Sequence, residues 1–230
     1  MSSPRHENAD SAENGSPSFD LSNGKSQIKA SINESVTSVA ELVRCSAPAW
    51  TGGLVIKSSA FASKACFCCG DFLLVNELMK SDNSTTSNVV LRLTQRLRMD
   101  PDRLDDVSQR ISAPDSVNKY CMMVVSQANI SLSFENYTPG SDGVEAAALQ
   151  TRPIRNIVTY LKSKDAAGVV LLTDNPTVST DELNDAKGVL YIFPPHKFSV
   201  DLLRKVAPNL AQDSTDKEDF LVFVLFRGPH

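Results

Sequence analysis

The alternation of residues 91–99 constrains the fold more than any other stretch of this chain. Four of its five odd positions are apolar (Leu91, Leu93, Leu97 and Met99), and arginines occupy three of the four even positions. Because successive side chains of a β-strand point to opposite faces, we predict one strand with an apolar row inward and Arg92, Arg96 and Arg98 outward. The stretch contains no Asp or Glu. Two interpretations remain open: a solvated face, or an anion site, since the guanidinium fork matches phosphate or carboxylate.

The remaining chain divides into a polar tail, a docking helix and a compact domain. Residues 1–26 are rich in Ser, Asn, Asp, Glu and Gly, and such a segment buries too little apolar surface to offset its chain entropy, so we predict disorder. Residues 27–47 predict an amphipathic docking helix and linker, capped by Ser31 or Asn33 and stopped by Pro48. The compact domain is expected over residues 48–230.

Short apolar runs within the compact domain predict an α+β architecture. Strands are expected at residues 52–57, 61–69, 91–99, 120–125, 169–172, 188–193 and 220–226. A short helix is expected at residues 72–79, and a second helix is expected to begin after an Asp100 cap. A third is expected from about residue 144 or 151 to 165, with Gly168 ending it, and a fourth from 198 to before 208. Loops are expected at 81–88, 126–143, 173–187 and 211–219. Because no βα rhythm repeats, we predict a closed or nearly closed barrel of six or seven strands with helices outside.

Charge and motifs argue against several function classes. The net charge of −4 disfavours bulk binding to nucleic acid. The chain has no glycine-rich phosphate loop, no Gly-x-Ser-x-Gly and no His-Glu-x-x-His, so we expect neither an enzyme nor a cofactor. A membrane-spanning helix needs about 20 apolar residues, and the apolar runs are much shorter. A membrane protein is therefore not expected.

The five cysteines predict reduced thiols rather than a metal site. Their number is odd and the N-terminus shows no signal peptide, as is typical of cytosolic or nuclear proteins. Cys66, Cys68 and Cys69 cluster in sequence, but a second cysteine pair at zinc-ligand spacing is missing. His196 follows two prolines and is expected to be a packing or surface residue.

Four motifs, in order across residues 45–230, resemble the SPOC domain of the Spen (split ends) family, with the spacing of its short members. They are WTGGLVIK at 50–57, LRLTQRLR at 91–98, TYLKSKDAAG at 159–168, and YIFPP at 191–195 followed by Phe198-Ser199. The resemblance implies a distorted β-barrel of about seven strands framed by helices. Family proteins usually carry RNA-recognition domains before SPOC, and this chain has none, so RNA binding does not follow.

The resemblance also implies a nuclear protein-interaction module that grips phosphoserine in acidic, disordered peptides. The implied partners are phosphorylated segments of nuclear corepressors, histone methyltransferase complexes, the RNA-methylation machinery and the tail of RNA polymerase II. The positions that match the family's phosphate-binding residues are Lys57, Arg92, Arg96, Arg98, Tyr160 and Lys164. The alternatives are a phospho-independent groove for acidic peptides and an RNA-binding domain.

Overall fold

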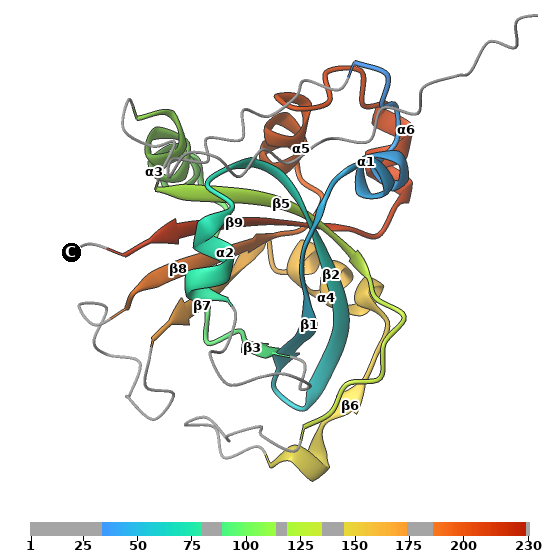
Figure 1. Cartoon of the computed structure of the whole chain (residues 1–230), viewed down its shortest axis with the longest axis vertical. Helices are drawn as coiled ribbons and strands as arrows, with labels where there is room; N and C mark the ends of the chain where they lie inside the picture. Colours follow the sequence, from blue (N-terminus) through green and yellow to red (C-terminus); the bar gives the residue numbers. More distant parts are fainter. Residues whose placement is uncertain (1–33, 80–88, 114–118, 135–144, 174–185, 229–230) are drawn as a thin grey trace, which may run out of the picture.

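The computed structural model describes residues 34–79, 89–113, 119–134, 145–173 and 186–228 (Figure 1). The predicted disordered tail, the 81–88 loop and most of the 173–187 loop lie outside these residues. Within them, no helix is long and apolar enough to cross a membrane.

One mixed sheet of nine strands forms the centre of the molecule. Its order is β3-β1-β2-β5-β9-β8-β7-β4, with β6 beside β2; the β1–β3 and β2–β6 pairs are parallel and the other pairs are antiparallel. The strands are β1 (Pro48–Ile56), β2 (Ser59–Gly70), β3 (Val89–Arg92), β4 (Gln95–Arg98), β5 (Tyr120–Gln127), β6 (Gln150–Thr151), β7 (Ala166–Leu172), β8 (Gly188–Phe193) and β9 (Leu221–Arg227).

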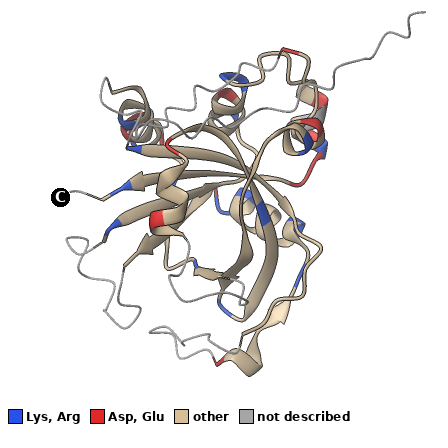
Figure 2. Ribbon diagram, viewed as in Figure 1, with Lys and Arg blue, Asp and Glu red and all other residues tan. Residues whose placement is uncertain are grey.

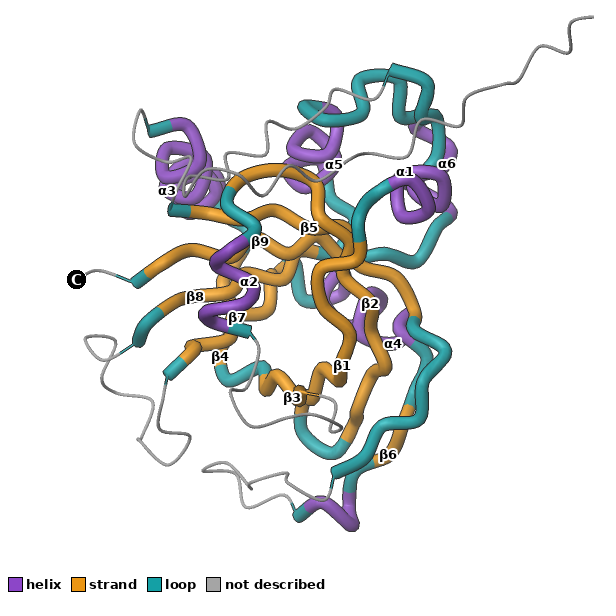
Figure 3. Tube along the Cα trace, in the orientation of Figure 1, coloured by secondary structure: helices purple, strands orange, loops and turns teal. Residues whose placement is uncertain are grey.

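The arginine-rich stretch connects the two ends of this sheet, and the prediction that it forms one strand is wrong. It is split into β3 and β4, with a break at Leu93 and Thr94. The Leu93 N–H donates to the Val55 carbonyl of β1 at 2.8 Å, and the Thr94 N–H donates to the Val169 carbonyl of β7 at 3.1 Å. Since β1 and β7 lie near opposite ends of the strand order, this one segment draws the two ends together and the sheet curls (Figure 3).

The α+β barrel class is thereby confirmed, whereas the number of strands is higher than predicted. Seven predicted segments correspond to nine strands because the arginine-rich stretch is divided and because the two-residue strand β6 also pairs with β2. A two-residue strand has too little length to show any periodicity, so β6 could not be read from a sequence pattern.

Two hydrophobic cores lie on the two faces of the sheet. The barrel interior contains Leu54, Met123 and Phe223, and helix α4 (Ile154–Ser163) adds Ile157 and other residues to it. The second core lies between the outer face and three helices: α1 (Val39–Cys45), α3 (Pro101–Ser112) and α5 (Lys197–Arg204) (Figure 1). Because β5 and β9 are covered on both faces, their sequences are continuous apolar runs rather than alternating ones.

Helix α1 begins later than predicted. Its N-cap is Ser38, which forms a capping box with Glu41, and the helix ends at Cys45 before Pro48 opens β1. The expected caps at Ser31 and Asn33 lie outside the described residues. The reciprocal hydrogen bonds of a capping box satisfy two backbone donors at once, which explains why the helix starts there.

Three other helical segments occur among the described residues. Helix α2 (Leu73–Leu78) lies where predicted, and the 3₁₀ turn η2 (Ala146–Ala148) precedes β6. Helix α6 (Gln212–Lys217) occupies the stretch that we predicted as an acidic loop, so that prediction is wrong. Its buried Thr215 donates its hydroxyl hydrogen to the Gln212 carbonyl, which anchors the helix locally.

We predicted that Gly168 ends the preceding helix, and this prediction is also wrong. Helix α4 ends at Ser163, and Asp165 adopts the left-handed backbone of the following turn, with φ of 45°. Gly168 lies inside β7, where a Cβ atom would be 2.4 Å from Leu93 Cδ2. The glycine is required for space beneath Leu93, at the point where the sheet closes.

Candidate anion-binding site

Arg96 and Tyr160 are in direct contact although they are distant in sequence. The Arg96 Nη1 group donates to the Tyr160 hydroxyl at 3.1 Å, and its guanidinium carbon lies 5.9 Å from the centre of the Tyr160 ring. Tyr160 is half-buried against the barrel core, while Arg96 is exposed on β4. Helix α4 thus provides a firmly packed partner that orients an exposed guanidinium group.

The C-terminal end of α4 lies beside the end of β4. Arg98 is opposite Ala166 in the β4–β7 pair, and the Met99 N–H donates to the Asp165 carbonyl at 3.0 Å. Lys164 is the C-cap of α4 and is exposed. The backbone therefore brings Arg98 and Lys164 to the same corner of the barrel as the Arg96–Tyr160 contact.

Arg98 already has an acidic partner, which the composition of the stretch did not indicate. Its Nε lies 3.2 Å from the Asp100 carboxylate, just beyond β4, and the two side chains are 79% and 49% exposed. An exposed pair of this kind contributes only about 0–1 kcal/mol. Arg98 can therefore exchange Asp100 for a stronger anion at little cost.

Arg92 and Lys57 lie at the β1 end of the same segment. Arg92 is in register with Val55, and Lys57 follows in the tight β1–β2 turn with φ of 51°. Lys57 is exposed, whereas Arg92 is half-buried with its Nη2 shielded from solvent. The described residues show no side-chain hydrogen bond or ion pair that joins Lys57 or Lys164 to the other four candidates.

Several basic residues lie in the lower half of the barrel in the view of Figure 2. Blue segments mark the β1–β2 turn, β3 and α4 there, while red segments gather around α1 and α6 at the opposite end. A set of cations around one fixed tyrosine hydroxyl can bind an anion. These six residues contain no nucleophile activated by a neighbouring base, so the arrangement does not point to covalent catalysis.

The cysteines do not contribute to this site. Cys66, Cys68 and Cys121 are buried, and all five cysteines are free thiols. Burial raises the pKa of the Cys68 and Cys121 thiols well above the ordinary value, which disfavours the thiolate needed for metal binding or nucleophilic attack. The described residues contain no group of three or more potential metal ligands.

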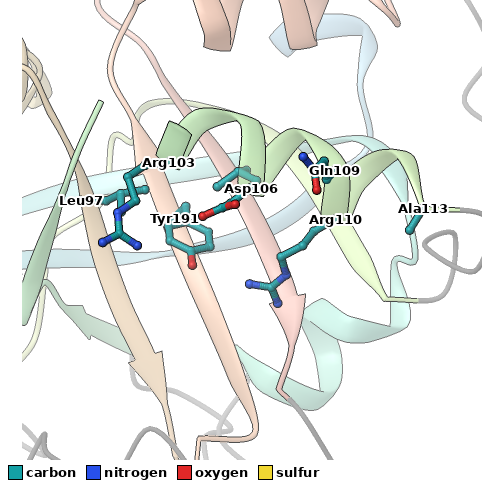
Figure 4. Close-up of a pocket in the computed structure, with 8 residues that line it drawn as sticks. Leu97, Arg103, Asp106, Gln109, Arg110, Ala113 and Tyr191 are labelled. Atoms are coloured by element: carbon teal, nitrogen blue, oxygen red, sulfur yellow. The ribbon is translucent and has the colours of Figure 1, made fainter. Parts of the chain in front are cut away.

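Sequence patterns did not reveal a pocket of about 560 Å³ between α3 and the outer face of the sheet (Figure 4). Arg103, Asp106 and Arg110 of α3 project toward it, and Leu97 of β4 and Tyr191 of β8 also line it. The guanidinium of Arg110 lies 4.1 Å from the Phe226 ring centre. Arg103, Asp106 and Arg110 are spaced by three, four and seven residues, which places them on one face of α3. That spacing was the one sequence pattern that could have indicated this pocket.

Comparison with known proteins assigns the fold to a family. The SPOC domain family model matches residues 41–228. The chain is 38% identical over 194 residues to RNA-binding protein spenito of Drosophila melanogaster, covering 84% of this chain and 22% of spenito. It is 34% identical over 180 residues to human RNA-binding protein 15, covering 78% of this chain and 17% of that protein.

More distant similarity extends to the Msx2-interacting protein of mouse, which is 26% identical over 177 residues, 76% of this chain and 4% of that protein. The chain spans about a fifth of the length of spenito and of RNA-binding protein 15. The family match spans every strand of the curled sheet, from β1 to β9. The chain therefore belongs to the SPOC domain family.

Proposed function

We propose that this chain is a phosphoserine-peptide-binding module of a nuclear transcriptional co-regulator. A SPOC domain of this family is a protein-interaction module of regulatory proteins. The finer proposal is that the interaction depends on a phosphate. It rests on one observation: the Arg96–Tyr160 contact lies on the segment that also carries Arg92 on β3 and Arg98 on β4.

Phosphoserine has the charge and the acceptors that suit this arrangement. At neutral pH its phosphate carries roughly −1.5 to −2 charges and three acceptor oxygens, so several donors can converge on it. In our proposal Arg96 holds the phosphate, Tyr160 orients Arg96 and offers its hydroxyl, and Lys57 and Arg92 approach from the β1 side. Lys164 and Arg98 would then pair with a neighbouring acidic residue or a second phosphate.

The expected strength follows from charge-assisted hydrogen bonds. Each contributes about 1.5–3 kcal/mol before screening, which corresponds to roughly 10- to 150-fold in affinity. Because Arg96 is exposed, salt weakens its Coulombic attraction to an anion. A moderate affinity that falls with ionic strength is therefore expected.

The proposed partners are phosphorylated acidic segments of nuclear corepressors, histone methyltransferase complexes, the RNA-methylation machinery or the RNA polymerase II tail. Such segments are extended and negatively charged, which complements the basic residues on the barrel. Binding would recruit these machineries to the site where the regulator acts.

Calorimetry with paired phosphoserine and serine peptides tests this proposal directly. We expect measurable binding only for the phosphorylated member, and a loss of roughly tenfold or more for Arg96→Ala. The matched control is Arg44→Ala, which removes an exposed arginine on α1 at the other end of the molecule. Equal affinity for both peptides, or equal losses for both variants, would contradict the proposal.

Two alternatives give different readouts. A phospho-independent adaptor for acidic peptides would bind the serine peptide too, and the apolar walls of the α3 pocket would then retain affinity at high salt. Several relatives are named RNA-binding proteins, so the domain should also be tested against oligonucleotides in a filter assay. We expect no retention, because the net charge is negative.

A further inference from the structure

Strand β4 is an open edge of the barrel. It is the last strand of the sheet order, and among the described residues it pairs only with β7. Antiparallel residues alternate between pairs that exchange hydrogen bonds and pairs that do not. Since the Met99 N–H donates to Asp165 in this ladder, the N–H and C=O groups of Arg96 and Arg98 point away from β7. Among the described residues, these groups have no backbone partner.

We infer that the partner peptide binds by adding an extended strand to this free edge of β4. This inference rests on the proposed function and states how the peptide is held there. In strand addition, main-chain hydrogen bonds provide affinity that does not depend on the peptide sequence, and pockets for alternate side chains provide specificity. The open groups belong to Arg96 and Arg98, the same residues whose side chains carry the positive charge, so backbone and phosphate contacts come from one strand.

The charges on β4 identify the occupant as an acidic peptide. A short edge strand bearing charged residues is also a common protection against aggregation. That protection acts by repelling strands of like charge, and here it would repel cationic segments while attracting an acidic one. The Arg96–Tyr160 contact adds a constraint that mere protection does not need, because it holds one arginine in place beside the edge.

The two faces of β4 lead to different environments. Arg96 points toward Tyr160 of α4, and alternation places Arg98 on the same face of β4, whereas Leu97 lies on the other face and lines the pocket beneath α3. Figure 4 shows Leu97 and Arg103 together at one end of this pocket. An added strand alternates in the same way. A phosphoserine facing Arg96 and an apolar residue facing Leu97 must therefore be separated by an odd number of positions.

The α3 pocket suits an apolar side chain flanked by acidic groups. Its walls include Leu97, Val107 and Tyr191, and two arginines stand at its margin against one aspartate. An aliphatic or aromatic anchor would contact the walls, and the arginines would attract a neighbouring carboxylate. The pocket would thus select which phosphorylated segments bind, since the phosphate contact alone does not discriminate among them.

The test uses the tightest binder from a library of acidic peptides with a fixed central phosphoserine. Each backbone nitrogen of that peptide is methylated in turn, which removes one N–H donor. We expect losses of about tenfold or more at every second position and little change between them, since only alternate N–H groups face β4. The library itself should select an apolar residue at an odd separation from the phosphoserine.

The possible outcomes distinguish a failure of strand addition from a failure of phosphate-dependent binding. Uniform tolerance of methylation by a phosphate-dependent binder would overturn strand addition and leave the proposed function standing. A library in which phosphoserine confers no advantage over serine would contradict the proposed function, and this inference with it.

A pair of protein variants tests the pocket separately. Gln109→Trp fills it from an exposed position on α3, and Ser112→Trp places the same ring on an exposed position of α3 that does not line the pocket. We expect Gln109→Trp to lose the preference for an apolar anchor while it keeps the preference for phosphate. Identical peptide selection by both variants would exclude the pocket from the binding surface.

Discussion

Leu93 packs over Gly168 where the two ends of the sheet approach each other, and substitution at position 168 gives a quantitative test of that packing. A Cβ atom at position 168 would lie 2.4 Å from Leu93 Cδ2 and 3.2 Å from its Cγ. Carbon atoms pack at about 3.5–4.0 Å. Leu93 is buried in the barrel interior, so its side chain cannot turn into solvent to escape the new methyl group. Gly168→Ala therefore overpacks the closure.

The size of the effect follows from two opposing contributions. Overpacking a buried site costs about 1–3 kcal/mol. Replacing glycine by alanine lowers the conformational entropy of the unfolded chain, which raises the free energy of unfolding by about 0.4–1 kcal/mol. We therefore expect Gly168→Ala to lower the free energy of unfolding by about 1–2 kcal/mol. Leu93→Ala should lower it by about 2–5 kcal/mol, because it leaves a cavity.

The double variant distinguishes a clash from a general weakening. Without the Leu93 side chain, the methyl group at 168 has room, so the double variant should be about as stable as Leu93→Ala alone. Denaturant unfolding followed by the fluorescence of Trp50, the single tryptophan, measures this coupling.

Gly53 provides the matched control, since a Cβ atom there would approach Leu132 instead of Leu93. Leu93→Ala combined with Gly53→Ala should be additive, as substitutions that share no contact usually are. A Gly168→Ala protein as stable as the parent, or strict additivity with Leu93→Ala, would refute this account of the closure.

Three further predictions concern the turn, helix α1 and the thiols. Lys57→Gly should weaken phosphopeptide binding in calorimetry, while the free energy of unfolding stays equal or rises by up to about 1 kcal/mol, because glycine tolerates the φ of 51°. Lys57→Ala should lose affinity without that gain in stability. Unchanged affinity in both variants would remove Lys57 from the site. Hydrogen bonds from the backbone and hydroxyl of Thr37 lower the pKa of Glu41, so the contribution of Glu41 to stability is lost as pH falls through its folded-state pKa. Glu41→Gln should therefore reduce the acid sensitivity of thermal unfolding. An unaltered pH profile of the melting temperature would argue against this role. A thiol reagent should label exposed Cys45 rapidly in the native protein and buried Cys68 only on unfolding, as mass spectrometry of the labelled peptides can show; fast native labelling of Cys68 would contradict its burial.

The strands that are covered on both faces were the most predictable part of the fold. Strand β8 has the predicted bounds, and β9 differs by one residue at each end, because a continuous apolar run identifies a doubly covered strand wherever it pairs. Helix α6 was missed for the opposite reason. Its sequence is acidic and has no apolar stripe, and its position is set by contacts such as the bond from the Ala211 N–H to the Thr37 carbonyl.

The candidate site shows the same division. Local backbone geometry alone determines which face of a strand each side chain occupies, so the alternation of residues 91–99 correctly predicted that Leu91, Leu93 and Met99 are buried. Arg96 and Arg98 are exposed as predicted, whereas Leu97 and Arg92 are half-buried. The alternation could not predict that Leu91 and Leu93 join the barrel interior while Met99 joins the outer core.

Pairing between distant segments decided the rest. The arginine-rich stretch breaks at Leu93 and Thr94 because its two halves bond to β1 and β7, and periodicity within one segment carries no information about its partners. Arg96 meets Tyr160, 64 residues away, only because closure of the sheet brings β4 beside α4. The sequence therefore determined which residues are candidates for binding an anion, and the tertiary structure determined that two of them, Arg96 and Tyr160, are in contact.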